Sequence, residues 1–152
     1  MGSEANIWGG FTADELEWQY NPRLTMTDFA GDFAALQALS AALAPALAPT
    51  LDIRFGDGPK ECFDLYSAGP GTPVHVFFHG GYWRATDKAD YAFIAAGLVQ
   101  RGVSVVLANY DLCPAVSVAE INRQALRCIR YVLEHQRELA VDARRLTLSG
   151  HS

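Results

Sequence analysis

The chain has 152 residues, half of them hydrophobic, and a net charge of −5, so it can bury one ordinary core. Acidic residues outnumber basic ones and no basic cluster stands out, which argues against a nucleic-acid partner. No apolar run reaches the roughly 18 residues of a membrane span, and no secretory leader follows Met1. Three scattered cysteines, Cys62, Cys113 and Cys128, are too few for a disulfide framework or a zinc site. We therefore expect a cytoplasmic protein with reduced thiols and without a membrane partner or a metal site.

The first fifty residues have the pattern of helices. Thr12 and Glu15 form a capping box, which predicts a helix that ends near Tyr20. A second helix is predicted to begin at Asp28, and Pro45 and Pro49 predict an irregular end. Its apolar face has helical spacing and consists of Phe29, Phe33, Leu36, Leu43 and Leu47.

From residue 51 onward the pattern changes to strands. Residues 51–55 alternate between apolar and polar, residues 56–59 are rich in glycine, and residues 61–66 read as a second strand, which together predict a hairpin. After a Gly- and Pro-rich loop, residues 74–78 form a nearly continuous apolar strand. Such a strand is typical of a sheet that is covered on both faces.

The rest of the chain alternates between helices and strands. A helix capped by Thr86 or Asp87 and ending at Gly102 precedes a buried strand at 103–107. A capping box of Ser117 and Glu120 opens a long helix to about residue 139, and 145–148 is the last strand. This order predicts an α/β fold with a mainly parallel sheet, right-handed crossovers and helices on both faces. The predicted inner helix faces consist of Tyr91, Ile94, Ala95, Leu98, Ile121, Ala125, Cys128 and Val132.

Ser152 is the candidate nucleophile. Gly150 and Ser152 form the first half of a G-x-S-x-G elbow, and an apolar strand precedes them as an elbow requires. The alternative is an ordinary serine at the end of a strand. A serine hydroxyl needs a histidine base and a carboxylate, which in elbow hydrolases follow the serine in the chain. We therefore expect both beyond residue 152, and none of the four histidines, His75, His79, His135 and His151, is a good substitute.

The segment His79-Gly80-Gly81 is the candidate oxyanion-hole loop. Acyl transfer places negative charge on a carbonyl oxygen, and preorganised backbone N–H groups at that point lower the barrier. We expect the donors to be the N–H groups of Gly80, Gly81 or Tyr82, with one more from the residue after Ser152. A plain Gly-Gly turn is the alternative for this segment taken alone.

Three aromatic residues are candidates for a substrate pocket. Tyr82 and Trp83 directly follow the glycines and could form the floor of a pocket for an aromatic substrate. For Trp83, packing in the core beneath the loop is an equal alternative. Tyr110 follows the strand at 103–107 and should border the same cleft, while Asp111 is expected to shape that loop.

These residues together resemble the α/β-hydrolase superfamily, in its hormone-sensitive-lipase-like group. The form His-Gly-Gly-x-Trp at residues 79–83 resembles the kynurenine formamidases, or arylformamidases. Residues 19–23, 109–114 and 148–152 are similar to further segments of that family. The resemblance runs from about residue 15 to Ser152 and implies the N-terminal part of one hydrolase domain, with a helical segment at 1–50 and the first strands at 51–152.

The resemblance implies hydrolysis of N-formyl-L-kynurenine to kynurenine and formate in tryptophan degradation. Ser152 would attack the formyl carbon, the oxyanion would rest on the backbone of residues 80–82, and no metal or cofactor would be needed. His79 would belong to the conserved motif, and Tyr82, Trp83 and Tyr110 to the motif and substrate pocket.

Two other functions remain open at this point. A carboxylesterase acting on short acyl esters would use the same machinery, and a truncated, non-catalytic binding module would need no triad. Because the strands, acid and base that follow the elbow in the family lie outside these residues, we expect the 152 residues alone to be inactive. A small aromatic formamide or ester is the expected partner, and a homodimer is an open alternative to a monomer.

Overall fold

The computed structural model describes residues 6–152. These residues form two compact units, with the boundary between Ala35 and Leu36. In the first unit, helix α1 (Ala13–Tyr20) begins with the predicted capping box of Thr12 and Glu15. A short helix α2 (Pro22–Thr25), which the sequence analysis did not predict, follows it. Asn21 caps α2 by accepting a hydrogen bond from the N–H of Arg23, and a proline at the first helical position has no N–H to lose.

Helix α3 (Phe29–Leu47) begins after Asp28, as predicted, and the Asp28 carboxylate accepts a hydrogen bond from Gly31 N at 2.9 Å. The helix continues through Pro45 to Leu47, the last residue of the predicted apolar face, so Pro45 does not interrupt it. Within the described residues it is the one helix whose length and composition would allow a membrane crossing, a weak test that core helices of soluble proteins also pass. The absence of a membrane partner stays a prediction.

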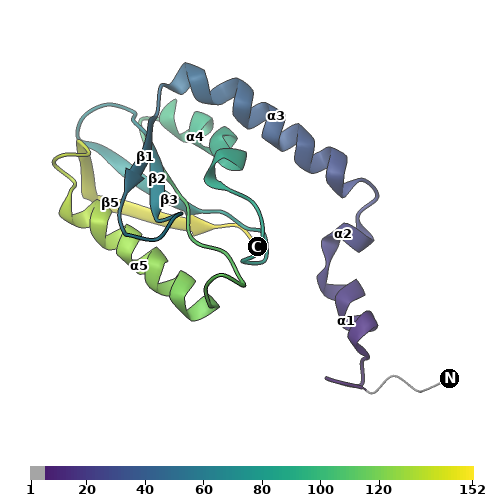
Figure 1. The fold of residues 1–152 in the computed structure, drawn as a ribbon. Coiled ribbons are helices and arrows are strands. Elements are labelled where there is room, and N and C mark those ends of the chain that lie inside the picture. Colours follow the sequence, from purple (N-terminus) through teal and green to yellow (C-terminus); the bar gives the residue numbers. More distant parts are fainter. Residues whose placement is uncertain (1–5) are drawn as a thin grey trace. The chain divides into compact units, whose positions relative to one another are not determined.

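The second unit is built on a five-stranded sheet with the order β1-β2-β4-β3-β5 (Figure 1). The strands are β1 (Thr50–Arg54), β2 (Cys62–Tyr66), β3 (Thr72–Phe78), β4 (Ser104–Ala108) and β5 (Val141–Gly150). Strand β3 lies parallel to both β4 and β5, whereas the predicted hairpin of β1 and β2 joins β4 in antiparallel orientation. The α/β architecture is confirmed, and the hairpin makes the sheet mixed.

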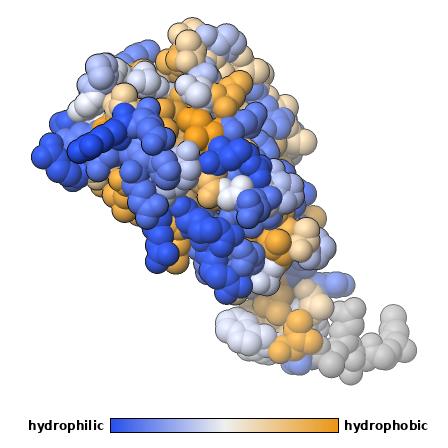
Figure 2. Space-filling model, turned by 60° about the vertical axis from the view of Figure 1, so that its left-hand side comes forward, coloured by the Kyte–Doolittle hydropathy of each residue, from blue (hydrophilic) through white to orange (hydrophobic). Residues whose placement is uncertain are grey.

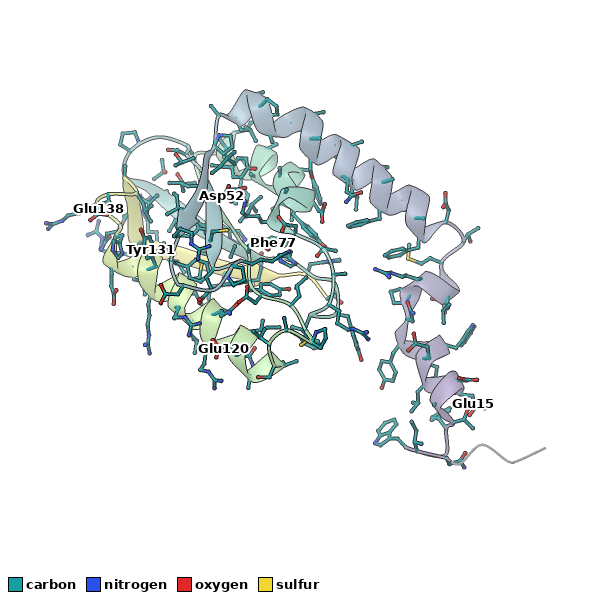
Figure 3. All side chains as sticks on the ribbon, in the orientation of Figure 1. Glu15, Asp52, Phe77, Glu120, Tyr131 and Glu138 are labelled. Carbon is teal, nitrogen blue, oxygen red and sulfur yellow. The ribbon has the colours of Figure 1, made fainter. Side chains whose placement is uncertain are left out.

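Helices cover both faces of this sheet, as predicted. On one face, Cys128 and Val132 of α5 (Val118–Glu134) pack with Val74 and Val76 of β3. Tyr131 also lies on α5 (Figure 3). Its ring meets Phe63 of β2 edge-on with centroids 5.8 Å apart. On the other face, the helical turn η1 (Lys88–Tyr91), helix α4 (Ala92–Val99) and the end of α3 pack against the sheet. The residues in that second cluster include Phe77, Tyr91, Ala95, Leu107 and Leu47.

Helix α5 departs from the prediction in two ways. It ends at Glu134, about five residues early, because residues 135–140 form turns that close with Ala140 in a left-handed conformation at φ +54°. Gln124 is buried on its inner face, whereas the predicted Ala125 is only half-buried. The buried amide of Gln124 is satisfied because it donates to Asp111 Oδ2 at 2.9 Å and accepts from Asp111 N at 2.8 Å.

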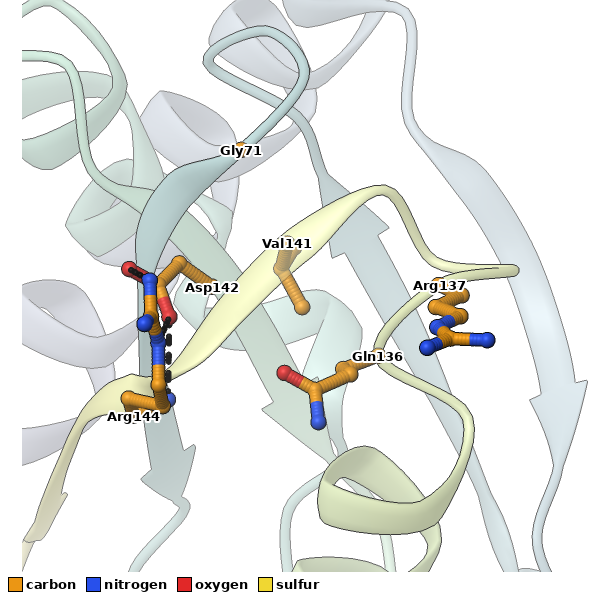
Figure 4. A pocket seen from close by; sticks show the side chains of 6 residues that line it. All are labelled: Gly71, Gln136, Arg137, Val141, Asp142 and Arg144. Carbon is orange, nitrogen blue, oxygen red and sulfur yellow. Dashed lines mark hydrogen bonds and ion pairs between the residues drawn. The ribbon is translucent and has the colours of Figure 1, made fainter.

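The surface around β5 and α5 is mostly hydrophilic, with hydrophobic patches between (Figure 2). A hollow of about 360 Å³ lies there, lined by Gly71, Gln136, Arg137, Val141, Asp142 and Arg144 (Figure 4). Gly71 precedes β3 and Val141 begins β5, so this hollow lies at the amino ends of the two parallel strands. Arg144 is paired with Asp142 within it at 2.9 Å. The candidate active site is at the opposite ends of these strands.

Candidate active site

The candidate nucleophile and the candidate oxyanion-hole loop follow two neighbouring parallel strands. Phe78 at the end of β3 is opposite Gly150 at the end of β5, and His151 N donates to Phe78 O at 3.2 Å. The carboxyl ends of parallel strands meet at one edge of a sheet, where α/β proteins bind their ligands. The structure therefore brings together two segments that are about seventy residues apart in the sequence.

Gly80 and Ser152 lie in close approach at this edge. A Cβ atom built on Gly80 would lie 3.3 Å from Ser152 Cβ, 2.8 Å from His151 O and 2.7 Å from His151 Nδ1. The last two distances are too short for real Cβ contacts, so a side chain at position 80 would displace the loop or the elbow. Glycine is required here by the proximity of the two backbones.

Ser152 itself has a backbone conformation that non-glycine residues rarely adopt. Its φ is +74°, in the left-handed region, two residues after the end of the ten-residue strand β5. A sharp, strained turn after a strand is the geometry that an elbow uses to expose a serine hydroxyl. The Ser152 side chain is exposed.

Residues 79–83, which we call the oxyanion loop, present three successive backbone N–H groups. No described residue accepts a hydrogen bond from the N–H of Gly80, Gly81 or Tyr82. The preceding carbonyls are held: His79 O accepts from Tyr110 Oη at 2.5 Å, and Gly80 O accepts from Thr86 Oγ1 at 2.6 Å. In a trans peptide the N–H points away from the C=O, so the N–H groups of Gly80 and Gly81 point away from these two anchors.

The oxyanion loop turns through three left-handed residues in a row. The φ values of Gly81, Tyr82 and Trp83 are +110°, +54° and +57°. The turn is closed by hydrogen bonds from the N–H groups of residues 84 and 85 to Gly81 O, and from Cys113 N to Trp83 O at 2.8 Å. The Tyr82 and Trp83 side chains are 62% and 41% exposed, and their ring centroids lie 5.6 Å apart. Their proposed contact with a substrate stays a prediction.

His79 lies beneath the loop and is 3% exposed. Its Nε2 is 3.0 Å from Asn109 Oδ1, its Nδ1 is 2.9 Å from Thr86 Oγ1, and its ring stacks on Tyr110 with centroids 4.2 Å apart. Burial lowers the pKa of His79 below its ordinary value, although hydrogen bonds with Gly80 and Asn109 favour the charged ring. With both nitrogens occupied and little exposure, this side chain supports the loop.

Tyr110 lies behind the loop as well and is 5% exposed. Burial raises the pKa of its phenol to about 12, so the hydroxyl that holds His79 O stays protonated. Asp111 accepts hydrogen bonds from Lys60 N and Gln124 Nε2, as expected for a residue that shapes this loop.

Sequence reasoning did not assign site roles to Thr86, Asp87 and Asn109, which hydrogen-bond around His79. Asn109 directly follows the buried strand β4, and a polar residue at the carboxyl end of such a strand was the available signal. Among residues 6–152, no group of three or more His, Cys, Asp or Glu side chains is arranged to hold a metal ion.

Comparison with known proteins identifies the fold family. Residues 75–152 match a family described as having the alpha/beta hydrolase fold. The chain belongs to the α/β-hydrolase fold family. A kynurenine formamidase of Danio rerio is 30% identical over 154 aligned residues, which cover 95% of this chain and 51% of that protein.

Other α/β-hydrolase relatives include esterases. An Arabidopsis thaliana protein provisionally named as an isoprenylcysteine α-carbonyl methylesterase is 33% identical over 66% of this chain and 22% of its own. The crystal structure of a provisionally assigned thioesterase from Silicibacter sp. tm1040 superposes with a TM-score of 0.79 at 28% identity, covering 90% of this chain and 51% of that one. The chain thus spans about half the length of the formamidase and of this solved structure.

Proposed function

We propose that this chain supplies the nucleophile and the oxyanion hole of a serine hydrolase that cleaves an aryl formamide, with N-formyl-L-kynurenine as the substrate. One observation carries the proposal. The oxyanion loop, with the free N–H groups of Gly80, Gly81 and Tyr82, closely approaches at Gly80 a serine in a left-handed conformation. The similarity to a kynurenine formamidase over 95% of the chain supports a formamide as the acyl substrate.

The chemistry follows from these positions. Ser152 Oγ attacks the formyl carbon, the C=O π electrons move onto the oxygen, and the hydroxyl proton passes to a general base. The new oxyanion accepts hydrogen bonds from the loop N–H groups, which stabilise charge that exists only after attack. When the C–N bond breaks, the aniline nitrogen takes the proton back from the base. Water then releases formate from Ser152 by the same two steps.

The base and its carboxylate partner would come from outside the 152 residues. His75 is engaged by the hydroxyls of Thr147 and Ser149, both at 2.7 Å, and His79 is buried under the loop. His135 is bonded to Tyr131 O at the end of α5. Because the formamidase relative is about twice as long, its remaining half offers room for both groups.

A substrate panel tests the formamide assignment. The full-length protein is expected to hydrolyse N-formyl-L-kynurenine with a higher kcat/KM than p-nitrophenyl acetate, read from kynurenine absorbance and p-nitrophenol release. Ser152→Ala is the control for background hydrolysis. Turnover of the ester without turnover of the formamide would overturn the formamide assignment and leave the hydrolase.

A carboxylesterase acting on short acyl esters is the second candidate, and the similarity to a methylesterase favours it. The same panel decides between the two. If neither substrate is turned over and Ser152 does not react with acylating reagents, the non-catalytic binding module is the remaining reading.

A further inference from the structure

Asp87 begins a chain of hydrogen bonds that ends on the oxyanion loop. Its Oδ2 accepts from Asn109 Nδ2 at 2.8 Å and from Lys60 Nζ at 3.1 Å. The other end of the Asn109 amide, Oδ1, faces His79 Nε2 at 3.0 Å. Asn109 and His79 are 4% and 3% exposed, so water does not compete freely for these contacts. The chain joins the start of η1, the loop after β4 and the loop after β3.

The charge of Asp87 sets the direction of every hydrogen bond in this chain. Burial opposes its ionisation, but the hydrogen bonds from Asn109 and Lys60 outweigh burial and hold the pKa of Asp87 below its ordinary value. An ionised carboxylate only accepts, so Asn109 must turn its NH2 group toward Asp87. The amide oxygen, which also only accepts, then faces His79. Nε2 of His79 must therefore carry a proton.

The other ring nitrogen completes the link to the loop. Nδ1 of His79 lies 2.8 Å from Gly80 O, which can only accept, and 2.9 Å from Thr86 Oγ1. The same hydroxyl lies 2.6 Å from Gly80 O. The ring and the hydroxyl together hold the Gly80 carbonyl, and this carbonyl fixes the opposite direction of the Gly81 N–H.

We propose that Asp87 is a positioning residue: through the Asn109 amide it keeps a proton on Nε2 of His79, and thereby holds the N–H groups of the oxyanion loop in place. Its role in catalysis rests on the proposed function. The proton arrangement does not, because it follows from contacts within the chain.

Asp87 also caps η1, since its Oδ1 accepts from Ala89 N at 3.3 Å. Asn caps helices about as well as Asp, so Asp87→Asn preserves this structural role. Its amide would present NH2 to Asn109, where the carboxylate accepted a hydrogen bond. The Asn109 amide is then expected to rotate and place its own NH2 against His79 Nε2, so that Nε2 loses its proton and the ring proton is on Nδ1, beside Gly80 O.

The experiment is ¹⁵N NMR of the histidine rings, with the His79 signals assigned by their loss in His79→Gln. In the wild-type protein we expect a protonated Nε2, and in Asp87→Asn a protonated Nδ1 with a bare Nε2. Steady-state kinetics on the formamide should show kcat lower by about 10- to 100-fold, the range expected for misplaced catalytic groups, with KM changed by less than about twofold.

Asp90→Asn is the matched control, because it makes the same chemical change three residues later. Asp90 Oδ2 accepts from Asp87 N at 2.9 Å in the same capping box, and no hydrogen bond joins Asp90 to Asn109. Asp90→Asn should keep the proton on Nε2 and keep kcat. A bare Nε2 in the wild-type protein overturns the proposal even if Asp87→Asn does not fold, as does a kcat that falls equally in both variants. If the proton moves as expected in a protein that hydrolyses neither substrate, the arrangement stands and the proposed function fails.

Discussion

At the scale of single residues, the absence of a side chain at Gly80 is as informative as the presence of a hydroxyl at Ser152. Two backbones approach so closely at this point that a Cβ would meet His151 at 2.7 and 2.8 Å. The sequence analysis expected Gly80 to be an oxyanion donor. The structure adds a reason for glycine at this position, which is the fit between the oxyanion loop and the elbow.

Gly80→Ala should lower kcat by roughly 10²- to 10³-fold, the cost of losing an oxyanion donor, because the methyl group separates the loop from Ser152. Steady-state kinetics measures the loss. Gly97→Ala is the control, because Gly97 lies inside α4 and its Cβ would meet only Arg101 Nη1, at 3.8 Å. This variant should keep kcat, and because alanine favours a helix interior over glycine it should be about 0.5–1 kcal/mol more stable. An unchanged kcat in Gly80→Ala would contradict the close approach.

At the scale of elements, the loop after β4 supports the loop after β3. The two strands are parallel neighbours, and Tyr110 reaches from one loop to donate to His79 O in the other. Because Tyr110 is buried, ionisation of its phenol would place a negative charge in the protein interior and would remove the donor of this hydrogen bond. The folded state therefore favours the protonated phenol and holds its pKa at about 12 instead of 10.

A group whose pKa is raised on folding contributes stability below its unfolded pKa and loses it as the pH rises through the folded value. The urea midpoint of the wild-type protein should therefore fall from about pH 10 toward pH 12. The urea midpoint of Tyr110→Phe should fall less steeply between these pH values. At pH 7 this variant should be about 1 kcal/mol less stable than the wild-type protein, because it lacks the hydrogen bond to His79 O. Tyr82→Phe, at a position 62% exposed, should follow the wild-type curve. Equal slopes in all three proteins would rule out the role of Tyr110.

Elements whose signals are local could be predicted from the sequence, and long-range contacts could not. The caps at Thr12, Asp87 and Ser117 depend on residues two or three positions away, and all three are present. The predicted box at Ser117 is incomplete, because the Glu120 carboxylate pairs with Arg123 and Arg127. The burial of Gln124 depends on Asp111, thirteen residues earlier, and helical spacing alone favours Ala125. In the site, the Gly-Gly pair and the serine could be recognised in the sequence, because their residue types are typical of an oxyanion hole and a nucleophile. The link from Asp87 to His79 could not, because it depends on which strands are neighbours in the sheet.

At the scale of the whole molecule, the proposed function assigns the nucleophile and the oxyanion donors to this chain and the proton-transfer groups to residues outside it. The chain spans about half of the formamidase relative, and the triad acid and base are proposed to lie in the part that it does not cover. Cytoplasmic location, a homodimer and the aromatic formamide as partner stay predictions at this scale. The family membership does not depend on them, because it rests on residues 75–152 alone.

The most direct test of the account is to treat the full-length protein with a fluorophosphonate and locate the adduct by mass spectrometry of its peptides. We predict one adduct on Ser152, and no adduct and no hydrolysis in Ser152→Ala. An adduct on a different residue, or hydrolysis that survives in Ser152→Ala, would contradict the claim that the strand β5 presents the nucleophile.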